Sequence, residues 1–118
     1  NDQQTTGLKQ TIENIFTTFH MAHKVILDYP GWNPDFDSKL VARTQLLAEK
    51  ITGYPAELKA IHAGLECALL IRKKPDLEIV SFGTTIKGAH SPSERLLIET
   101  VPPFWQLVVA LLGELAVD

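Results

Sequence analysis

Apolar residues recur at helical spacing in several stretches of the chain. From Leu8 to Phe19 they return every three to four residues, which is typical of a helix with one buried face. The last such stretch opens with Pro102 and Pro103, which fit the first turn of a helix because its N–H groups have no internal partner. Thr100 is the predicted N-cap. The predicted helices span about residues 7–20, the stretch from Asp37 or Ser38 to Gly53, residues 65–72, and residues 101–116.

Between these helices lie short runs that favour strands. Residues 24–29 are rich in β-branched and aromatic side chains, and residues 77–82 are almost continuously apolar. Residues 58–62 are predicted to form a further short strand. Residues 95–99 fit neither pattern. The alternation of helix and strand after Pro34 predicts an α/β fold, a small sheet with flanking helices. The final helix carries more apolar surface than so few strands can cover, so the chain resembles a piece of a larger domain.

The composition argues against several classes of protein. The net charge is −3, so the chain lacks the basic patch typical of proteins that bind nucleic acid. No run of eighteen apolar residues is present, and we expect no membrane span. A single cysteine, Cys67, excludes an internal disulfide and suits a reducing compartment. The composition predicts a soluble, cytoplasmic protein.

Two polar loops carry the residues best suited to chemistry. His90 follows Gly88 and Ala89 and precedes Ser91-Pro92, small or turn-forming neighbours that let a ligand approach. Its imidazole could bind a transition metal or act as a base, and the simpler alternative is a surface histidine without a task. The second loop, residues 61–67, follows a predicted strand. Loops beyond the carboxyl ends of strands are where ligands gather in α/β sheets.

The second loop leaves several interpretations open. The backbone N–H groups around Gly64 could hold a carboxylate. Glu66 could contact a ligand, although its charge also suits the start of a helix. A single zinc ion held by His62, Glu66, Cys67 and His90 is a further possibility, but a small buried thiol is the commoner state of a cysteine.

Several motifs together resemble one family. They are Tyr29-Pro-Gly-Trp-Asn-Pro34, Ile61-His-Ala-Gly-Leu-Glu-Cys67, Ser81-Phe-Gly83, Lys87-Gly-Ala-His-Ser-Pro-Ser-Glu-Arg95 and Ile98-Glu-Thr-Val101. In this order they are similar to the C-terminal part of aminoacyl-histidine (Xaa-His) dipeptidases. These enzymes are zinc peptidases of the family that includes carboxypeptidase G and aminoacylase.

The resemblance implies a domain organisation. Residues 1–30 correspond to the end of an inserted lid or dimerisation domain, and residues 31–118 to the C-terminal part of the catalytic domain. The full-length enzyme is expected to hold two zinc ions, to hydrolyse dipeptides of the Xaa-His type and to form a homodimer. The chain is then expected to pack against the remainder of the catalytic domain.

The resemblance also assigns site residues. His90 matches the last zinc ligand of the family. The substrate-binding loop corresponds to residues His62, Ala63, Gly64, Leu65 and Glu66. The other zinc ligands and the general-base glutamate of the family have no counterpart in this sequence, so it contains no catalytic residue and we expect the fragment alone to be inactive. The alternative is a stand-alone α/β binding or dimerisation module without catalysis.

Overall fold

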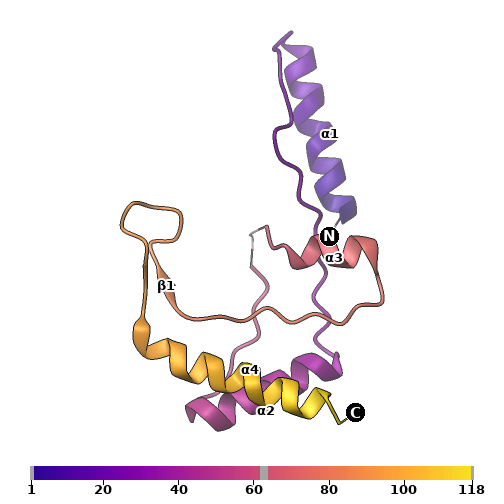
Figure 1. Ribbon diagram of the computed structural model, residues 1–118. Helices are drawn as coiled ribbons and strands as arrows, with labels where there is room; N and C mark the ends of the chain where they lie inside the picture. Colours follow the sequence, from indigo (N-terminus) through magenta and orange to yellow (C-terminus); the bar gives the residue numbers. More distant parts are fainter. Residues whose placement is uncertain (1, 62–63, 118) are drawn as a thin grey trace. The chain divides into compact units, whose positions relative to one another are not determined.

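The computed structural model describes residues 2–61 and 64–117. The chain forms two compact units, one of residues 1–34 with 60–77 and the other of residues 35–59 with 78–118. Figure 1 colours the elements along the chain. The first unit contains the helices α1 (Asp2–Thr18) and α3 (Cys67–Lys73). The second contains α2 (Lys39–Thr52), the strands β1 (Ile86–Lys87) and β2 (Arg95–Leu96), the short 3-10 helix η1 (Ile98–Thr100) and α4 (Val101–Leu115).

The first predicted helix is confirmed as α1, although it begins earlier in the chain than its apolar stripe. The polar residues before Gly7 include no proline, so nothing interrupts the helical hydrogen bonds there. The helix ends in a Schellman motif. His20 adopts a left-handed conformation with φ 51°, its N–H donates to the Thr17 carbonyl at 3.0 Å, and the Met21 N–H donates to the Phe16 carbonyl at 2.8 Å. These two bonds satisfy carbonyls that the helix end leaves free.

The predicted strand at residues 24–29 is wrong. This segment has no regular secondary structure, and its apolar side chains Ile26 and Leu27 are exposed. A β-strand needs a neighbour to pair its backbone groups, and no strand of the described residues lies beside this segment. The segment is tied to α1 by side chains instead. Lys9 forms an ion pair with Asp28, and the ring of Phe16 stacks on His23 with centroids 5.4 Å apart.

The helix predicted over residues 65–72 is confirmed, with its start shifted, as α3. The helix buries Ala68 and carries Arg72 and Lys73 in its last turn, where positive charge suits the negative end of the helix dipole. The chain leaves helical structure at Lys74, before Pro75, as the sequence predicts.

The ends of the second predicted helix, α2, are set by residues at its two termini. Ser38 is the N-cap of α2, and its hydroxyl accepts a hydrogen bond from the Val41 N–H. Gly53 follows the last turn with φ 76°, and its N–H donates to the Glu49 carbonyl at 2.8 Å. A left-handed residue at this position is most easily a glycine. Both predicted ends of the helix are therefore confirmed.

The final helix is confirmed as α4, and Thr100 occupies the predicted N-cap position, although its side chain does not cap the helix. Thr100 is the last residue of η1 and makes no side-chain bond to the first turn of α4. Its hydroxyl donates instead to the Leu97 carbonyl at 2.7 Å and accepts from the Thr85 N–H at 3.0 Å. The hydroxyl therefore fastens the base of the β1–β2 hairpin to the start of α4. Pro102 and Pro103 occupy the first turn, where they cost no internal hydrogen bond.

α2 and α4 pack against each other and enclose a small core (Figure 1). Leu47 of α2 meets Leu107 and Leu111 of α4 at its centre. Four partly buried residues surround these three, namely Leu40, Ala48, Ile51 and Ala110. The opposite side of α4 leaves Trp105 and Leu112 exposed. The two helices thus bury one face of α4 and leave another apolar face open.

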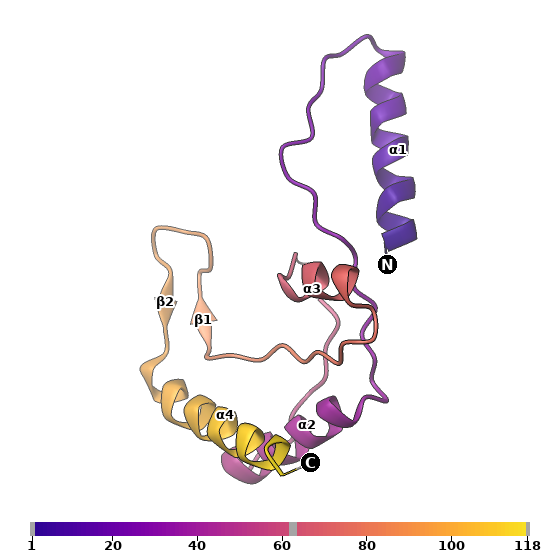
Figure 2. The same cartoon turned by 45° about the vertical axis from the view of Figure 1, so that its right-hand side comes forward.

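The sheet of the described residues is a two-stranded antiparallel hairpin, which Figure 2 shows beside α4. Ile86 pairs with Leu96, and Lys87 pairs with Arg95. The small sheet and the helices agree with the predicted mixture of helix and strand, but the positions of the strands differ.

The strands predicted at residues 58–62 and 77–82 are wrong in the parts that can be compared. Residues 58–61 and 77–82 have no strand structure, and His62 lies outside the described residues. The almost continuous apolar run of residues 77–82 is not fully buried, since Phe82 is exposed. The ring of Phe82 lies near that of Phe104, with centroids 5.9 Å apart. None of the helices in the described ranges combines the length and apolar character needed to cross a membrane.

Acid is expected to weaken the unit that contains α2. The Ser38 hydroxyl donates to Glu78 Oε1 at 2.6 Å. This bond lowers the pKa of the Glu78 carboxyl from its usual 4.5; desolvation opposes it, and the backbone N–H groups of Leu40 and Lys39 and the Lys39 charge add to it. A carboxyl with a lowered folded-state pKa stabilises the fold above its unfolded pKa, and this stabilisation is lost as the pH falls below about 4.5.

The Glu78→Gln variant should therefore lose less stability than the wild type when the pH drops. Urea unfolding followed by circular dichroism at pH values from about 6 to 3 measures this difference. Glu99→Gln makes the same change of charge at an exposed position and is the control. Identical pH profiles for the two variants would contradict the role of Glu78.

Candidate functional site

The loop that carries His90 connects the two strands of the hairpin. Its backbone is closed by two hydrogen bonds, from the Ser91 N–H to the Gly88 carbonyl at 3.1 Å and from the Glu94 N–H to the Ser91 carbonyl at 3.0 Å. The Ser91 hydroxyl donates to the same Gly88 carbonyl at 2.6 Å. The pairing of β1 with β2 and these three hydrogen bonds together define a compact loop.

Gly88 occupies a position that favours glycine. Its φ is 65°, in the left-handed region. A Cβ atom added there would lie 3.1 Å from the Ser91 hydroxyl and 3.3 Å from the Ser93 carbonyl oxygen. Both the backbone conformation and the crowding favour glycine. The positive φ and the crowding together explain why a glycine stands two residues before His90.

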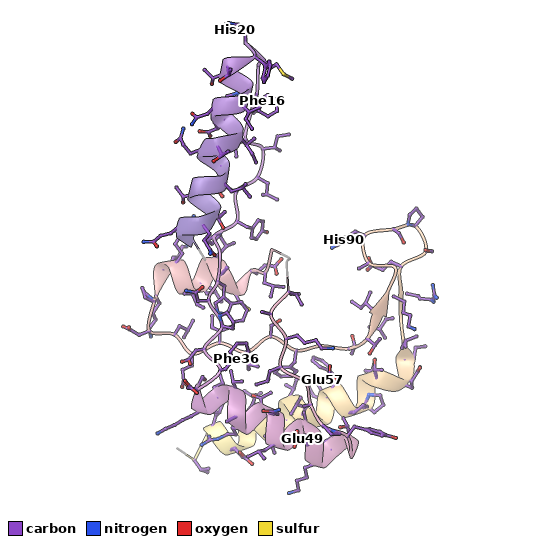
Figure 3. All side chains as sticks on the ribbon, turned by 180° about the vertical axis from the view of Figure 1, so that it is seen from behind. Phe16, His20, Phe36, Glu49, Glu57 and His90 are labelled. Carbon is purple, nitrogen blue, oxygen red and sulfur yellow. The ribbon has the colours of Figure 1, made fainter. Side chains whose placement is uncertain are left out.

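His90 is exposed on this loop and also adopts a left-handed conformation, with φ 62°. Positive φ is uncommon for residues other than glycine, although histidine is among those that tolerate it best. The His90 N–H donates to Glu94 Oε2 at 2.6 Å. Figure 3 shows His90 on the loop at the end of the hairpin. Its imidazole is accessible to a ligand.

The structure thus brings His90 together with Glu94, a residue that the sequence analysis did not single out. The signal that could have revealed it is the spacing, because an acidic residue four positions after a loop histidine can turn back and accept a backbone N–H group. Arg95 follows, and its guanidinium donates to the Ser93 carbonyl at 3.4 Å.

The predicted substrate-binding loop is only partly described. His62 and Ala63 lie outside the described residues. Gly64 lies against the ring of Tyr29, since a Cβ atom added to this glycine would meet Tyr29 Cγ at 3.3 Å. The contact joins two of the motifs on which the family resemblance rests. Gly64 is therefore at a position where a larger side chain would have to displace an aromatic ring.

Leu65 and Glu66 lead into α3. Leu65 is half-buried and Glu66 is exposed. Glu66 is the residue before the first turn, and its carboxylate makes no hydrogen bond that caps the helix. Residues 64–66 and His90 belong to different compact units, so their roles in one site remain a prediction.

The described residues supply one suitable metal ligand on the loop but no complete metal centre. An exposed imidazole is a ligand type that zinc prefers, and His90 fits this requirement. Within residues 2–61 and 64–117, no three His, Cys, Asp or Glu side chains are grouped so that they could hold a metal ion. Cys67 is a free, half-buried thiol. A two-zinc centre needs several further carboxylates and imidazoles.

Comparison with known proteins gives an independent test of the resemblance. The chain is 39% identical over 87 residues to the cytosol non-specific dipeptidase of Escherichia coli (strain K12). The aligned stretch covers 74% of this chain and 18% of the relative, so the chain spans less than a fifth of the length of that enzyme. No family model matches the chain. The similarity agrees with the resemblance to a dipeptidase that the motifs indicate, and it extends over about three quarters of this chain.

Proposed function

We propose that this chain is the C-terminal segment of a zinc-dependent dipeptidase. The observation that carries the proposal is the 39% identity over 87 residues to a dipeptidase. The order of the motifs supports the assignment of residues 1–30 to the end of a lid or dimerisation domain and of residues 31–118 to the catalytic domain. The chain would act together with the remainder of that domain, because it contributes only His90 to the proposed metal centre.

The proposed role of His90 is to donate its imidazole to one of two zinc ions. Zinc in such a site lowers the pKa of a bound water and polarises the carbonyl that the water attacks. Residues 62–66 would border the dipeptide, with Gly64 and its neighbours offering backbone groups. A glutamate outside this sequence would transfer the proton. The chain's own contribution is therefore to hold metal and substrate.

The resemblance also leads to proposals for the substrate, the oligomeric state and the cellular compartment of the full-length protein. We infer a preference for dipeptides of the Xaa-His type from the family that the motifs resemble. The full-length protein is inferred to be a homodimer. The relative is named a cytosol dipeptidase, and the composition favours the same compartment for this chain.

We expect the purified 118-residue chain to hydrolyse no dipeptide, with or without zinc, because one histidine cannot hold two metal ions. The longer parent protein should hydrolyse dipeptides and lose this activity when a chelator removes its metal. Release of free amino acids from a panel of dipeptides, some ending in histidine, measures both the activity and the preference. Zinc-dependent hydrolysis by the chain alone would contradict the proposal.

The alternative is a stand-alone binding or dimerisation module. The packed α2–α4 core and the capped ends of α2 are compatible with a chain that folds without a partner. The intact mass of the native gene product separates the two hypotheses. A product several times heavier than this chain supports the dipeptidase, whereas a product of the same mass supports the module.

A further inference from the structure

We propose that Glu94 is a positioning residue for His90: its carboxylate holds the backbone of the loop in the conformation that presents the imidazole. The importance of this for metal binding rests on the proposed function, in which His90 is a zinc ligand. The conformation itself can be tested without any metal.

The contact between the two residues is direct. The His90 N–H donates to Glu94 Oε2 at 2.6 Å, a short distance typical of a bond whose acceptor is charged. Such bonds are about twice as strong as those between neutral groups. The Glu94 carboxylate therefore acts on the residue that carries the proposed ligand.

The conformation of His90 requires such a restraint. Its φ of 62° lies in a region that side-chain-bearing residues seldom occupy. Residues held there remain only where their surroundings determine the conformation. Restraint of the His90 N–H by a carboxylate fixes the peptide plane before the histidine, and hence the direction in which its Cβ leaves the backbone.

One other bond of the loop also restrains His90, because the Ser91 N–H to Gly88 carbonyl bond closes a four-residue turn with His90 at its third position. The Ser91 N–H and hydroxyl both donate to the Gly88 carbonyl, and the Glu94 N–H donates to the Ser91 carbonyl. These contacts close the loop and anchor Glu94 itself. The turn bond and the Glu94 bond act on the two peptide units that flank the histidine, and the Glu94 carboxylate is the side chain that bonds the His90 N–H itself.

Nuclear magnetic resonance of the 118-residue chain tests the proposal. In the Glu94→Ala variant we expect the His90 amide to exchange with solvent about tenfold faster, because a bond to a charged acceptor is lost. The backbone chemical shifts and φ-dependent couplings of His90 should move away from their left-handed values. Glu94→Gln retains an oxygen acceptor and should restore part of the protection.

The matched control is Ser93→Ala. It changes an exposed residue next to Glu94 whose hydroxyl forms a hydrogen bond with the Ser91 hydroxyl and not with the backbone of His90, so the His90 signals should stay close to the wild type. Circular dichroism confirms that each variant keeps its helices. Unchanged His90 exchange and couplings in Glu94→Ala, or equal changes in Ser93→Ala, would overturn the proposal.

Zinc affinity of the longer parent protein gives the second readout. Glu94→Ala should weaken zinc binding by about tenfold, in the range found for residues that orient metal ligands, with a smaller loss for Glu94→Gln. If Glu94→Ala changes the loop conformation but leaves the zinc affinity unchanged, Glu94 only stabilises the local structure, and its positioning role is overturned. If the unmutated parent binds no zinc, the proposed function fails, and the spectra of the chain alone decide whether Glu94 positions His90.

Discussion

Replacement of His90 by alanine in the longer parent protein is expected to remove most of the dipeptidase activity and one of the bound zinc ions. Loss of a residue that merely orients a metal ligand already costs about 10–100-fold in metal affinity or activity, and loss of the ligand itself should cost more. Zinc content by atomic emission and the rate of dipeptide hydrolysis measure the two effects. Normal activity in this variant would remove His90 from the site.

Two controls separate the imidazole from the backbone. His90→Asn removes the ring but keeps a residue that tolerates positive φ, so it should be as inactive as His90→Ala. His20→Ala removes another exposed histidine that also has a left-handed conformation, and this variant should keep its zinc. Activity in His90→Asn would show that the conformation at residue 90, and not its imidazole, is what the enzyme needs.

The helices could be predicted from the sequence because their signals are local. The side chain at Ser38 and the left-handed residue at Gly53 lie within or beside α2 and act on neighbouring backbone groups. The end of α1 was harder, since the Schellman motif at His20 uses a residue that no apolar pattern marks. A histidine is a less common choice than glycine at such a position.

The predictions of strands were wrong because a strand requires a pairing partner, which the residues of the segment itself do not specify. Residues 24–29 and 77–82 have the composition of strands, yet composition does not supply the neighbour that a strand must pair with. The strands observed are Ile86–Lys87 and Arg95–Leu96, which meet because a tight loop brings them together. A strand at residues 24–29 or 77–82 would need a partner from elsewhere in the chain, and the composition of the segment does not reveal whether one is present.

Some features of the candidate site could be predicted from the sequence, whereas its contacts required the structure. The small, turn-forming neighbours of His90 indicated an exposed loop, which the structure shows, whereas the role of His90 as a metal ligand stays a prediction. The role of Gly88 became visible only when the distances to Ser91 and Ser93 were known. The bond from His90 to Glu94 depends on the turn of the loop, and the packing of Gly64 on Tyr29 depends on two motifs meeting in space.

The second large effect is expected in the core between α2 and α4. Leu111 is only 6% exposed and packs with Leu47 and Leu107. Its replacement by alanine removes buried methyl groups and leaves a cavity, which costs 2–5 kcal/mol in well-packed proteins. Because this core is small and open at its edges, we expect a loss of roughly 2–3 kcal/mol in the free energy of unfolding.

Leu112→Ala is the matched control for this experiment. It makes the same chemical change one position along α4, at a side chain that is 62% exposed, and the small gain in helix propensity is common to both variants. Its effect should stay within about 0.5 kcal/mol. Urea unfolding followed by circular dichroism compares the two midpoints, and the difference between them isolates burial at Leu111. Equal losses would show that α4 does not turn Leu111 toward α2, and would argue instead that both leucines are covered by a surface outside this pair of helices.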